Sequence, residues 1–200
     1  DVSGTVHSAN TGTNLMDSAW HHLVGVCDET HSNVTLYVDG LVASVATISP
    51  SNGLQSSSSP VVIGARMGAA TGNYNNQFFG SIDEAAVYNY ALTIDQVRSH
   101  YFSVGVAPAL ILQPTNTTVA EGSSVTFYSQ GFGSPTLAYQ WYNSDGYQPT
   151  TALVGMTSSN LTLTGVTSIK SGTYYQLVVT NAFGTVTSDA VALAAIIPPA

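Results

Sequence analysis

Short runs of alternating apolar and polar residues follow one another along nearly the whole chain, and they constrain its fold more than any other feature. A period of two places alternate side chains on opposite faces, which is typical of a strand with one buried face. Asp39-Gly40 is expected to join two such runs as a two-residue hairpin turn, because glycine supplies a positive φ and aspartate tolerates one. The sequence therefore predicts an all-β fold. The strand-like runs lie within residues 21–28, 34–40, 41–48, 60–67, 81–90, 124–130, 137–143, 160–166, 173–181 and 185–193.

One helix is expected to interrupt this pattern. Residues 91–101 (ALTIDQVRSHY) have apolar side chains near helical spacing, and Thr93 is expected to cap the first turn. The segment 103–114 then brings a glycine and two prolines, which break both periods. This segment predicts a domain boundary near residue 106. The expected domains are a first one over 1–105, a second one over 106–196 and a linker at 197–200.

The charge of the chain limits its partners. Charged side chains make up only 7% of the 200 residues, and the net charge is −8. Arg66, Arg98 and Lys170 are too few cations to neutralise the phosphates of a nucleic acid or an anionic membrane surface. No apolar run approaches the roughly 20 residues needed to span a bilayer. We therefore expect neither nucleic-acid binding nor membrane insertion.

Composition also bears on the location of the protein. Ser, Thr, Asn and Gly are abundant, and this favours an exported bacterial surface protein that is secreted or held at the cell surface. Cys27 is the only cysteine, so no internal disulfide can form and cysteine usage does not indicate the compartment. The chain shows no initiating Met and no signal peptide, which is typical of a mature or internal piece of a longer protein.

The C-terminal half carries two spaced motifs within residues 108–194, YQWY around Trp141 and SGTYYQLVVTN around Tyr175. These motifs resemble the immunoglobulin-like domain of the I-set type. The resemblance implies that Trp141 packs in the sandwich core, and that Tyr175 is the tyrosine-corner residue whose hydroxyl bonds back to the backbone. Ser129 and Leu177 stand where the family has its two bridging cysteines. We therefore expect an immunoglobulin-like β-sandwich without a disulfide.

The N-terminal half carries three motifs in order, WHHLVGVCD, LYVDG and GSIDEAAVYNYAL. They resemble the laminin-G-like, concanavalin A-like jelly roll of bacterial surface proteins. The resemblance implies a partial sandwich in which residues 1–104 form the C-terminal two-thirds and the N-terminal strands are missing. Either the chain is a slice of a longer polypeptide or another chain supplies the absent strands. The matching positions are Trp20, His22, Asp39, Gly40, Gly80, Ile82, Asp83, Glu84, Tyr88, Ala91 and Leu92.

Residues 20–31 bring three histidines close to Cys27 in the sequence, which suggests a metal site at first sight. Zinc needs His and Cys side chains that converge on one point. His21 and His22 are adjacent on a predicted strand and therefore point to opposite faces. His21 also lies about 20 Å from Cys27 along an extended strand at ~3.3 Å per residue. We interpret the stretch as a sheet interior in which Trp20 is a core residue and Cys27 a small buried apolar one.

Acidic residues raise two further questions, catalysis and calcium. Glycosidases need two carboxyl groups about 5–10 Å apart across a bound sugar, whereas neighbours such as Asp83 and Glu84 face opposite ways on a strand. We therefore predict no catalytic residues and no enzyme. The resembled family often holds calcium with Asp side chains and loop carbonyls, and by this analogy the candidate ligands are Asp28, Asp39 and Asp83. A calcium site needs six or more oxygens, and the sequence shows no such ligand pattern.

The loop of residues 68–80 (GAATGNYNNQFFG) is the candidate ligand-binding segment. Tyr74 stands between Asn73 and Asn75, so an aromatic face lies beside amide donors, an arrangement suited to a sugar ring. Asn and Gly also favour loops for backbone reasons alone, and a solvated loop without a ligand is the alternative.

Three functions stay open at this point. The first is a non-catalytic extracellular module pair for adhesion or for recognition of a glycan or surface protein. The second is a structural subunit of an extracellular filament or matrix, in which neighbouring copies assemble by strand complementation. The third is a carbohydrate-binding appendage of a larger glycoside hydrolase.

Overall fold

The computed structural model describes residues 7–12, 15, 17–48, 61–67, 74–75, 77–144, 146 and 148–197, with the backbone alone for 66–67 and 74–75. Contacts divide the chain into two compact units, Asp1–Arg98 and Ser99–Ala200. This division falls inside a helix, whereas the sequence placed the boundary near residue 106. Each unit is described by itself below.

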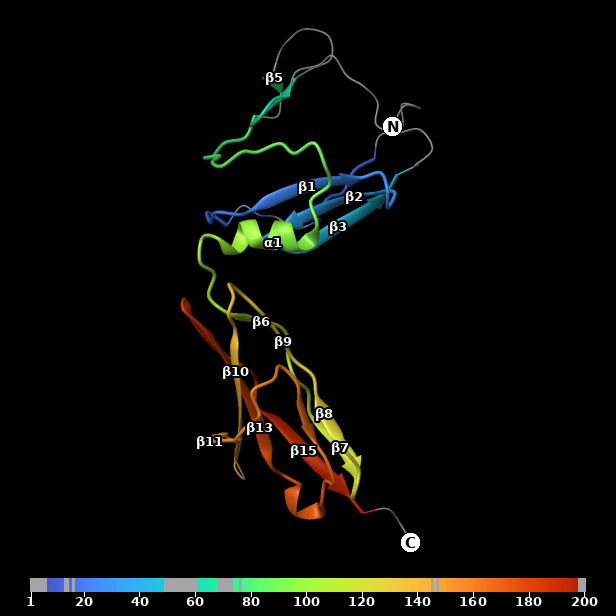
Figure 1. Cartoon of the computed structure of the whole chain (residues 1–200), viewed down its shortest axis with the longest axis vertical. Coiled ribbons are helices and arrows are strands. Elements are labelled where there is room, and N and C mark those ends of the chain that lie inside the picture. Colours follow the sequence, from blue (N-terminus) through green and yellow to red (C-terminus); the bar gives the residue numbers. More distant parts are fainter. Residues whose placement is uncertain are drawn as a thin grey trace. The chain divides into compact units, whose positions relative to one another are not determined.

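The N-terminal unit is built on an antiparallel sheet in the order β1-β2-β3. The predicted hairpin between β2 and β3 is confirmed, because Asp39 and Gly40 have φ values of 52° and 74°. A short pair, β4 and β5, follows in the chain (Figure 1). The strands of this unit are β1 (Leu23–Asp28), β2 (Asn33–Val38), β3 (Leu41–Thr47), β4 (Arg66–Met67) and β5 (Tyr74–Asn75).

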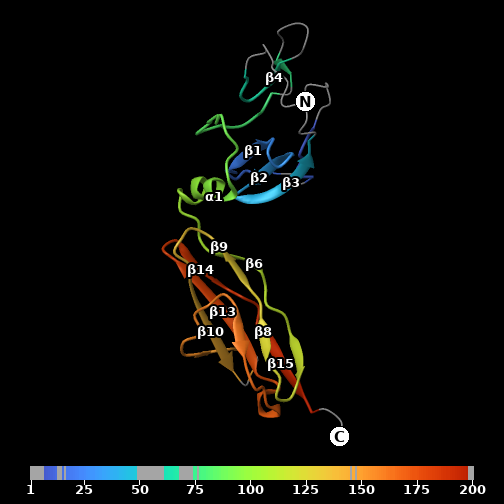
Figure 2. The same cartoon turned by 45° about the vertical axis from the view of Figure 1, so that its right-hand side comes forward.

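Helix α1 (Ile94–Phe102) begins where the sequence predicted it. Thr93 Oγ1 accepts a hydrogen bond from the Gln96 N–H at 3.3 Å, and Gln96 Oε1 accepts one from the Thr93 N–H at 2.9 Å. This reciprocal cap satisfies two N–H groups at the helix start. Figures 1 and 2 show α1 lying against the sheet β1-β2-β3. Val97 of α1 is fully buried and packs with residues of the sheet and of the preceding segment: Val26, Tyr37 and Leu92. No helix in the described part of the chain is long and apolar enough to cross a membrane.

Two predicted strands of the N-terminal unit are wrong in whole or in part. Of the predicted strand 60–67 the structure describes residues 61–67, and among these only Arg66–Met67 is a strand; no strand forms over residues 81–90, all of which are exposed. Glu84 has a φ of 50°, which interrupts an extended conformation. A segment with alternating apolar and polar residues forms a strand only where a neighbouring strand supplies the backbone hydrogen bonds. Residues 81–90 have no such neighbouring strand among the described residues.

The C-terminal unit is a β-sandwich. One sheet has the order β11-β10-β13-β15-β7, with β14 also paired to β13, and two further pairs are β8 with β12 and β6 with β9. A 3₁₀ helix (Ser168–Lys170) precedes β13. The strands are β6 (Ala109–Leu112), β7 (Thr117–Ala120), β8 (Val125–Phe127), β9 (Gln130–Phe132), β10 (Ala138–Ser144), β11 (Thr151–Ala152), β12 (Leu161–Leu163), β13 (Tyr174–Asn181), β14 (Gly184–Thr187) and β15 (Val191–Ile196).

The first two strands of this unit were not expected from the sequence. β6 pairs antiparallel with β9, whereas β7 pairs parallel with β15 in the other sheet. Between them lies Pro114, which is buried and has no N–H to donate. The chain therefore changes sheets at the proline that suggested an interruption of the strand pattern.

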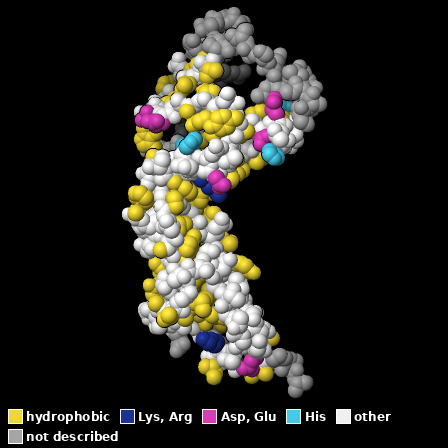
Figure 3. Space-filling model, in the orientation of Figure 1, with side chains coloured by type: hydrophobic (Ala, Val, Ile, Leu, Met, Phe, Trp, Pro, Cys, Tyr) yellow, Lys and Arg dark blue, Asp and Glu magenta, His cyan; other side chains and the backbone are white. Residues whose placement is uncertain are grey.

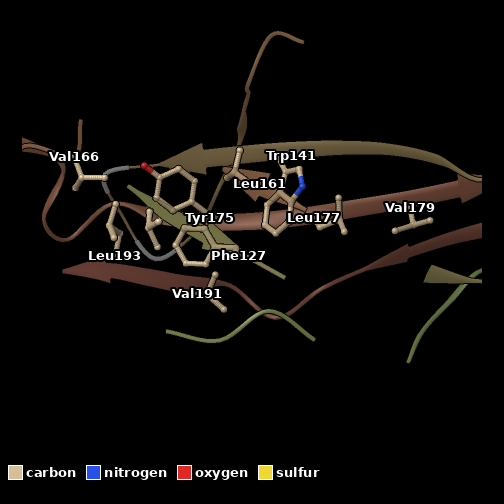
Figure 4. Packing of buried hydrophobic residues seen from close by; sticks show 10 residues of the cluster. Phe127, Trp141, Leu161, Val166, Tyr175, Leu177, Val179, Val191 and Leu193 are labelled. Carbon is tan, nitrogen blue, oxygen red and sulfur yellow. The ribbon is translucent and has the colours of Figure 1, made fainter. Parts of the chain in front are cut away.

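The sandwich core is apolar and dense in aromatic rings. Trp141 is completely buried, and Phe127 and Tyr175 are 1% exposed. The ring of Phe127 lies 5.3 Å from that of Tyr175 and 6.3 Å from that of Trp141, centroid to centroid (Figure 4). Trp141 Nε1–H donates to the Ser158 carbonyl at 3.1 Å, so the buried indole keeps a hydrogen bond. Leu177 is also fully buried, and apolar burial holds the sheets together where the family has a disulfide.

Candidate functional site

The residues just before β1 meet the turn between β2 and β3. Antiparallel pairing of β1 with β2 sets Leu23 opposite Val38, so the next residues outward, His21 and His22, reach Asp39. His21 Nδ1 lies 2.8 Å from Asp39 Oδ2, and His21 Nε2 lies 3.0 Å from Asp17 Oδ1. We call Asp17, His21 and Asp39 the His21 clamp.

Backbone hydrogen bonds fix the Asp39 side of the clamp. Asp39 Oδ1 accepts the His22 N–H at 2.9 Å, and the Asp39 N–H donates to the His22 carbonyl at 2.9 Å. Arg98 Nε–H of α1 donates to the Gly40 carbonyl at 3.3 Å. The turn is therefore anchored both to the start of β1 and to the helix.

Electrostatics follow from these contacts. Hydrogen bonds to Asp39 and then to Asp17 raise the pKa of His21 above its ordinary value, because each carboxylate favours the charged ring. The pKa of Asp17 is lowered, most strongly by the hydrogen bond from the Ala19 N–H and next by the hydrogen bond with His21. The His21 ring is 18% exposed and the Asp39 side chain 29%, whereas the Asp17 side chain is 58% exposed. The clamp thus has an inner carboxylate and an outer one.

Trp20 does not lie in the core, which corrects our expectation. Its side chain is 70% exposed, and within residues 20–28 only Val26 is buried. β1 begins at Leu23, so Trp20 precedes the strand and the alternation argument does not extend to it. The interpretation of this stretch as a sheet interior is therefore wrong except around Val26. Cys27 is half-buried, and desolvation raises the pKa of its thiol, which lowers its reactivity.

The three predicted calcium ligands are not brought together. Asp28 Oδ2 lies 2.7 Å from His31 Nδ1 in the turn after β1, and this hydrogen bond lowers the pKa of Asp28. Asp39 belongs to the His21 clamp, and Asp83 Oδ1 accepts the Glu84 N–H at 2.9 Å in an exposed segment. Within the ranges that the structure describes, no group of three or more His, Cys, Asp or Glu side chains is placed to hold a metal ion.

The predicted ligand-binding residues stay a prediction. Asn73 lies outside the described residues. Tyr74 and Asn75 are described by their backbone alone, as strand β5 paired with β4, with Met67 opposite Tyr74 and Arg66 opposite Asn75.

Exposed aromatic rings are the feature of the N-terminal unit that sequence reasoning missed. Besides Trp20, Phe79 is 92% exposed, and Tyr88 and Tyr90 form an exposed edge-to-face pair with ring centroids 5.7 Å apart. Figure 3 shows hydrophobic side chains at the surface among mostly uncharged groups. The missed signal was the YNY triplet at residues 88–90, which we assigned to a strand, and the sequence argument gave the two phenylalanines of the loop 68–80 no role.

Comparison with known families identifies both units. Residues 1–98 match the concanavalin A-like lectin/glucanases superfamily, and residues 107–181 match the immunoglobulin domain. The two matches support the expected domain types, concanavalin A-like in the first unit and immunoglobulin-like in the second. The expected placement of residues 1–104 as the C-terminal two-thirds of a jelly roll is corrected, because the match covers residues 1–98.

Solved structures of immunoglobulin domains resemble about half of the chain. A mutant complex of titin with obscurin-like 1 is 21% identical and covers 48% of this chain and 99% of that chain, with a TM-score of 0.40. A chimeric titin carrying a decorin peptide is 29% identical (47% and 98%, TM-score 0.40). The tandem immunoglobulin repeats of Dlar are 18% identical (46% and 49%, TM-score 0.40). No curated protein sequence matches the chain.

Proposed function

We propose that the chain is a non-catalytic recognition module pair of an extracellular bacterial surface protein. The N-terminal unit binds a glycan, and the immunoglobulin-like unit is the scaffold that spaces it. The observation that carries the proposal is the exposure of Trp20 beside the acidic His21 clamp. Both domain types occur typically in extracellular proteins, which supports this location.

The chemistry of the Trp20 surface suits a sugar. An exposed indole offers a flat apolar face with an N–H at its edge, and it loses little conformational entropy when a ligand covers it. Asp17 precedes Trp20 by three positions, is exposed and accepts hydrogen bonds, so its carboxylate can receive a sugar hydroxyl. Tyr74, with Asn73 and Asn75, remains the second proposed contact region, on the sequence argument given above.

The hydrogen bonds of the aspartates favour binding over catalysis. Asp17 and Asp28 already accept hydrogen bonds from histidines and backbone N–H groups, and these bonds lower the pKa of both carboxyl groups. A glycosidase needs one carboxyl group kept protonated as a general acid, and these hydrogen bonds oppose that state. We therefore expect no hydrolysis of any polysaccharide that the protein binds.

A glycan array and affinity electrophoresis with soluble polysaccharides test the proposal. Trp20→Ala is expected to weaken binding about tenfold or more, as loss of a central aromatic contact does. Tyr128→Ala is the matched control, because Tyr128 is an exposed aromatic residue of the immunoglobulin-like unit. Equal losses in the two variants, or no binding by the wild-type chain, would contradict the proposal. Tyr74→Ala tests the second contact region separately.

One observation favours a second function, assembly into an extracellular fibre by strand complementation. Residues 81–90 have the alternation of a strand, yet within the described part of the chain they are exposed and form no strand. Ile82 and Val87 are exposed there, and an added strand would cover such side chains. Sedimentation velocity tests this function. Concentration-dependent polymers that Val87→Lys abolishes would support it, and a monodisperse monomer at high concentration would contradict it.

A further inference from the structure

The His21 clamp requires a particular protonation state. Both ring nitrogens of His21 face carboxylate oxygens, at 2.8 Å for Asp39 and 3.0 Å for Asp17. An ionised carboxylate only accepts hydrogen bonds, and a neutral imidazole has a single N–H to donate. Both contacts are therefore hydrogen bonds only when the ring carries two protons.

Loss of one proton must break one of the two contacts, and the structure indicates which one. Asp39 is held by the His22 N–H and by the turn, so Nδ1–H of His21 keeps its bond to Asp39. The bare Nε2 lone pair then faces the Asp17 carboxylate, and these two acceptors repel each other. Asp17 is exposed, and its other bond, from the Ala19 N–H at 2.8 Å, is local and moves with it.

Trp20 lies inside the segment that Asp17 ties down. The segment bends tightly at Ser18, whose φ is 67°. The Asp17 side chain contacts the ring of His21, four positions further along the chain. We infer that the His21 clamp is a pH-sensitive device, which fixes the Trp20 segment while His21 is doubly protonated and releases it when His21 is neutral. The inference concerns the position of Trp20 and does not depend on glycan binding.

The groups that face His21 set the pH range. Asp39 and Asp17 contact its ring directly and favour the charged form, whereas Arg98 donates to the neighbouring Gly40 carbonyl and His22 is adjacent in sequence. Because the pKa of His21 is raised above 6.5, the stabilisation is complete below about pH 6.5 and is lost as the pH rises through the raised value. The pKa of Asp17 is lowered from 3.8, so the clamp is lost on the acid side only as the pH falls through that lowered value.

Fluorine NMR of the full chain labelled with 5-fluorotryptophan tests the inference. The chain has two tryptophans, and the other one, Trp141, is completely buried in the immunoglobulin-like unit. We expect the Trp20 resonance to shift between pH 5 and 9. The midpoint of this shift should equal the titration midpoint of the His21 ring, which carbon-detected NMR measures separately. The Trp141 resonance should stay in place and reports that the immunoglobulin-like unit remains folded.

Variants separate the clamp from general effects of pH. His21→Gln is expected to abolish the Trp20 response. Asp17→Asn should lower the midpoint of the His21 ring, because it removes a charge, and should reduce the Trp20 response, because the asparagine amide can donate to the bare Nε2 of the neutral ring. His31→Gln is the matched control, because His31 contacts Asp28 at 2.7 Å in the same unit without touching the clamp, and it should leave the response unchanged. A flat Trp20 resonance while His21 titrates in the wild-type chain would overturn the inference, as would a response that survives in His21→Gln.

Discussion

The two units use their aromatic side chains in opposite ways. The immunoglobulin-like unit encloses Phe127, Trp141 and Tyr175 between its sheets, whereas the N-terminal unit leaves Trp20 and Phe79 at the surface. A second sheet faces the first in the immunoglobulin-like unit, so inward residues are covered on both sides. In the described part of the N-terminal unit the sheet β1-β2-β3 packs against α1, which covers a smaller cluster around Val97.

This contrast shows that the same alternation of residues leads to burial in one place and to exposure in another. What decides is whether a second layer exists to cover the apolar face. A single exposed aromatic residue has little effect on stability or solubility. Its ring is, however, well suited to contact a ligand. We therefore expect binding to depend on the first unit and stability to depend most strongly on the core of the second.

The largest expected effect is that of Trp141→Ala. Removing this indole leaves a cavity in the sandwich, and the expected loss of unfolding free energy is about 3–5 kcal/mol. Differential scanning calorimetry of the full chain measures it as a lowered transition of the immunoglobulin-like unit. The control is Trp20→Ala, which should change stability by less than about 0.5 kcal/mol. Similar losses in both variants would remove the contrast between the units.

A smaller effect is expected for Asn181→Ala in the immunoglobulin-like unit. Asn181 Nδ2 donates to the carbonyls of Val106 at 2.8 Å and Ser134 at 3.0 Å, which ties the first residues of the unit to its far strands. Loss of both bonds should cost about 2 kcal/mol, because the carbonyl of the buried Ser134 loses this donor and the Val106 carbonyl keeps only the Ser134 N–H. Chemical denaturation measures this change. Thr185→Ala, an exposed change in β14, is the control and should stay within ~0.5 kcal/mol.

The smallest effect is expected at the turn of the N-terminal unit. The hydrogen bond to His31 lowers the pKa of Asp28, so it stabilises the fold above pH 3.8 and this contribution is lost as the pH falls through the lowered value. His31→Gln should raise the pKa of Asp28 toward its ordinary value, with little change in stability at neutral pH. Carbon-detected NMR titration of the Asp28 carboxyl group measures the shift, and an unchanged midpoint would contradict the hydrogen bond between Asp28 and His31.

Local signals explain what the sequence predicted well. The Asp39-Gly40 turn and the Thr93 cap depend on residues within four positions of each other, and both appear as expected. The strands around Trp141 and Tyr175 were also predicted, because the spacing of these residues is specific to one fold. Sequence reasoning failed where a partner element decides the outcome. Residues 81–90 alternate like a strand but find no neighbouring strand in the described part of the chain.

The His21 clamp was missed because its parts are brought together by strand register. Asp39 lies 18 positions from His21, and the sequence argument treated the two histidines as members of one strand instead of as residues outside it. Extending the hairpin register beyond Leu23 and Val38 would have placed His21 beside Asp39. The exposure of Trp20 was missed for the same reason, since it depends on where β1 begins.

Acrylamide quenching of the two tryptophans tests the contrast between the units most directly. We predict two emitting populations in the wild-type chain, one quenched freely by acrylamide and one protected, with Trp20→Phe removing only the freely quenched one. Equal protection of both tryptophans, or loss of the protected population in Trp20→Phe, would contradict the account.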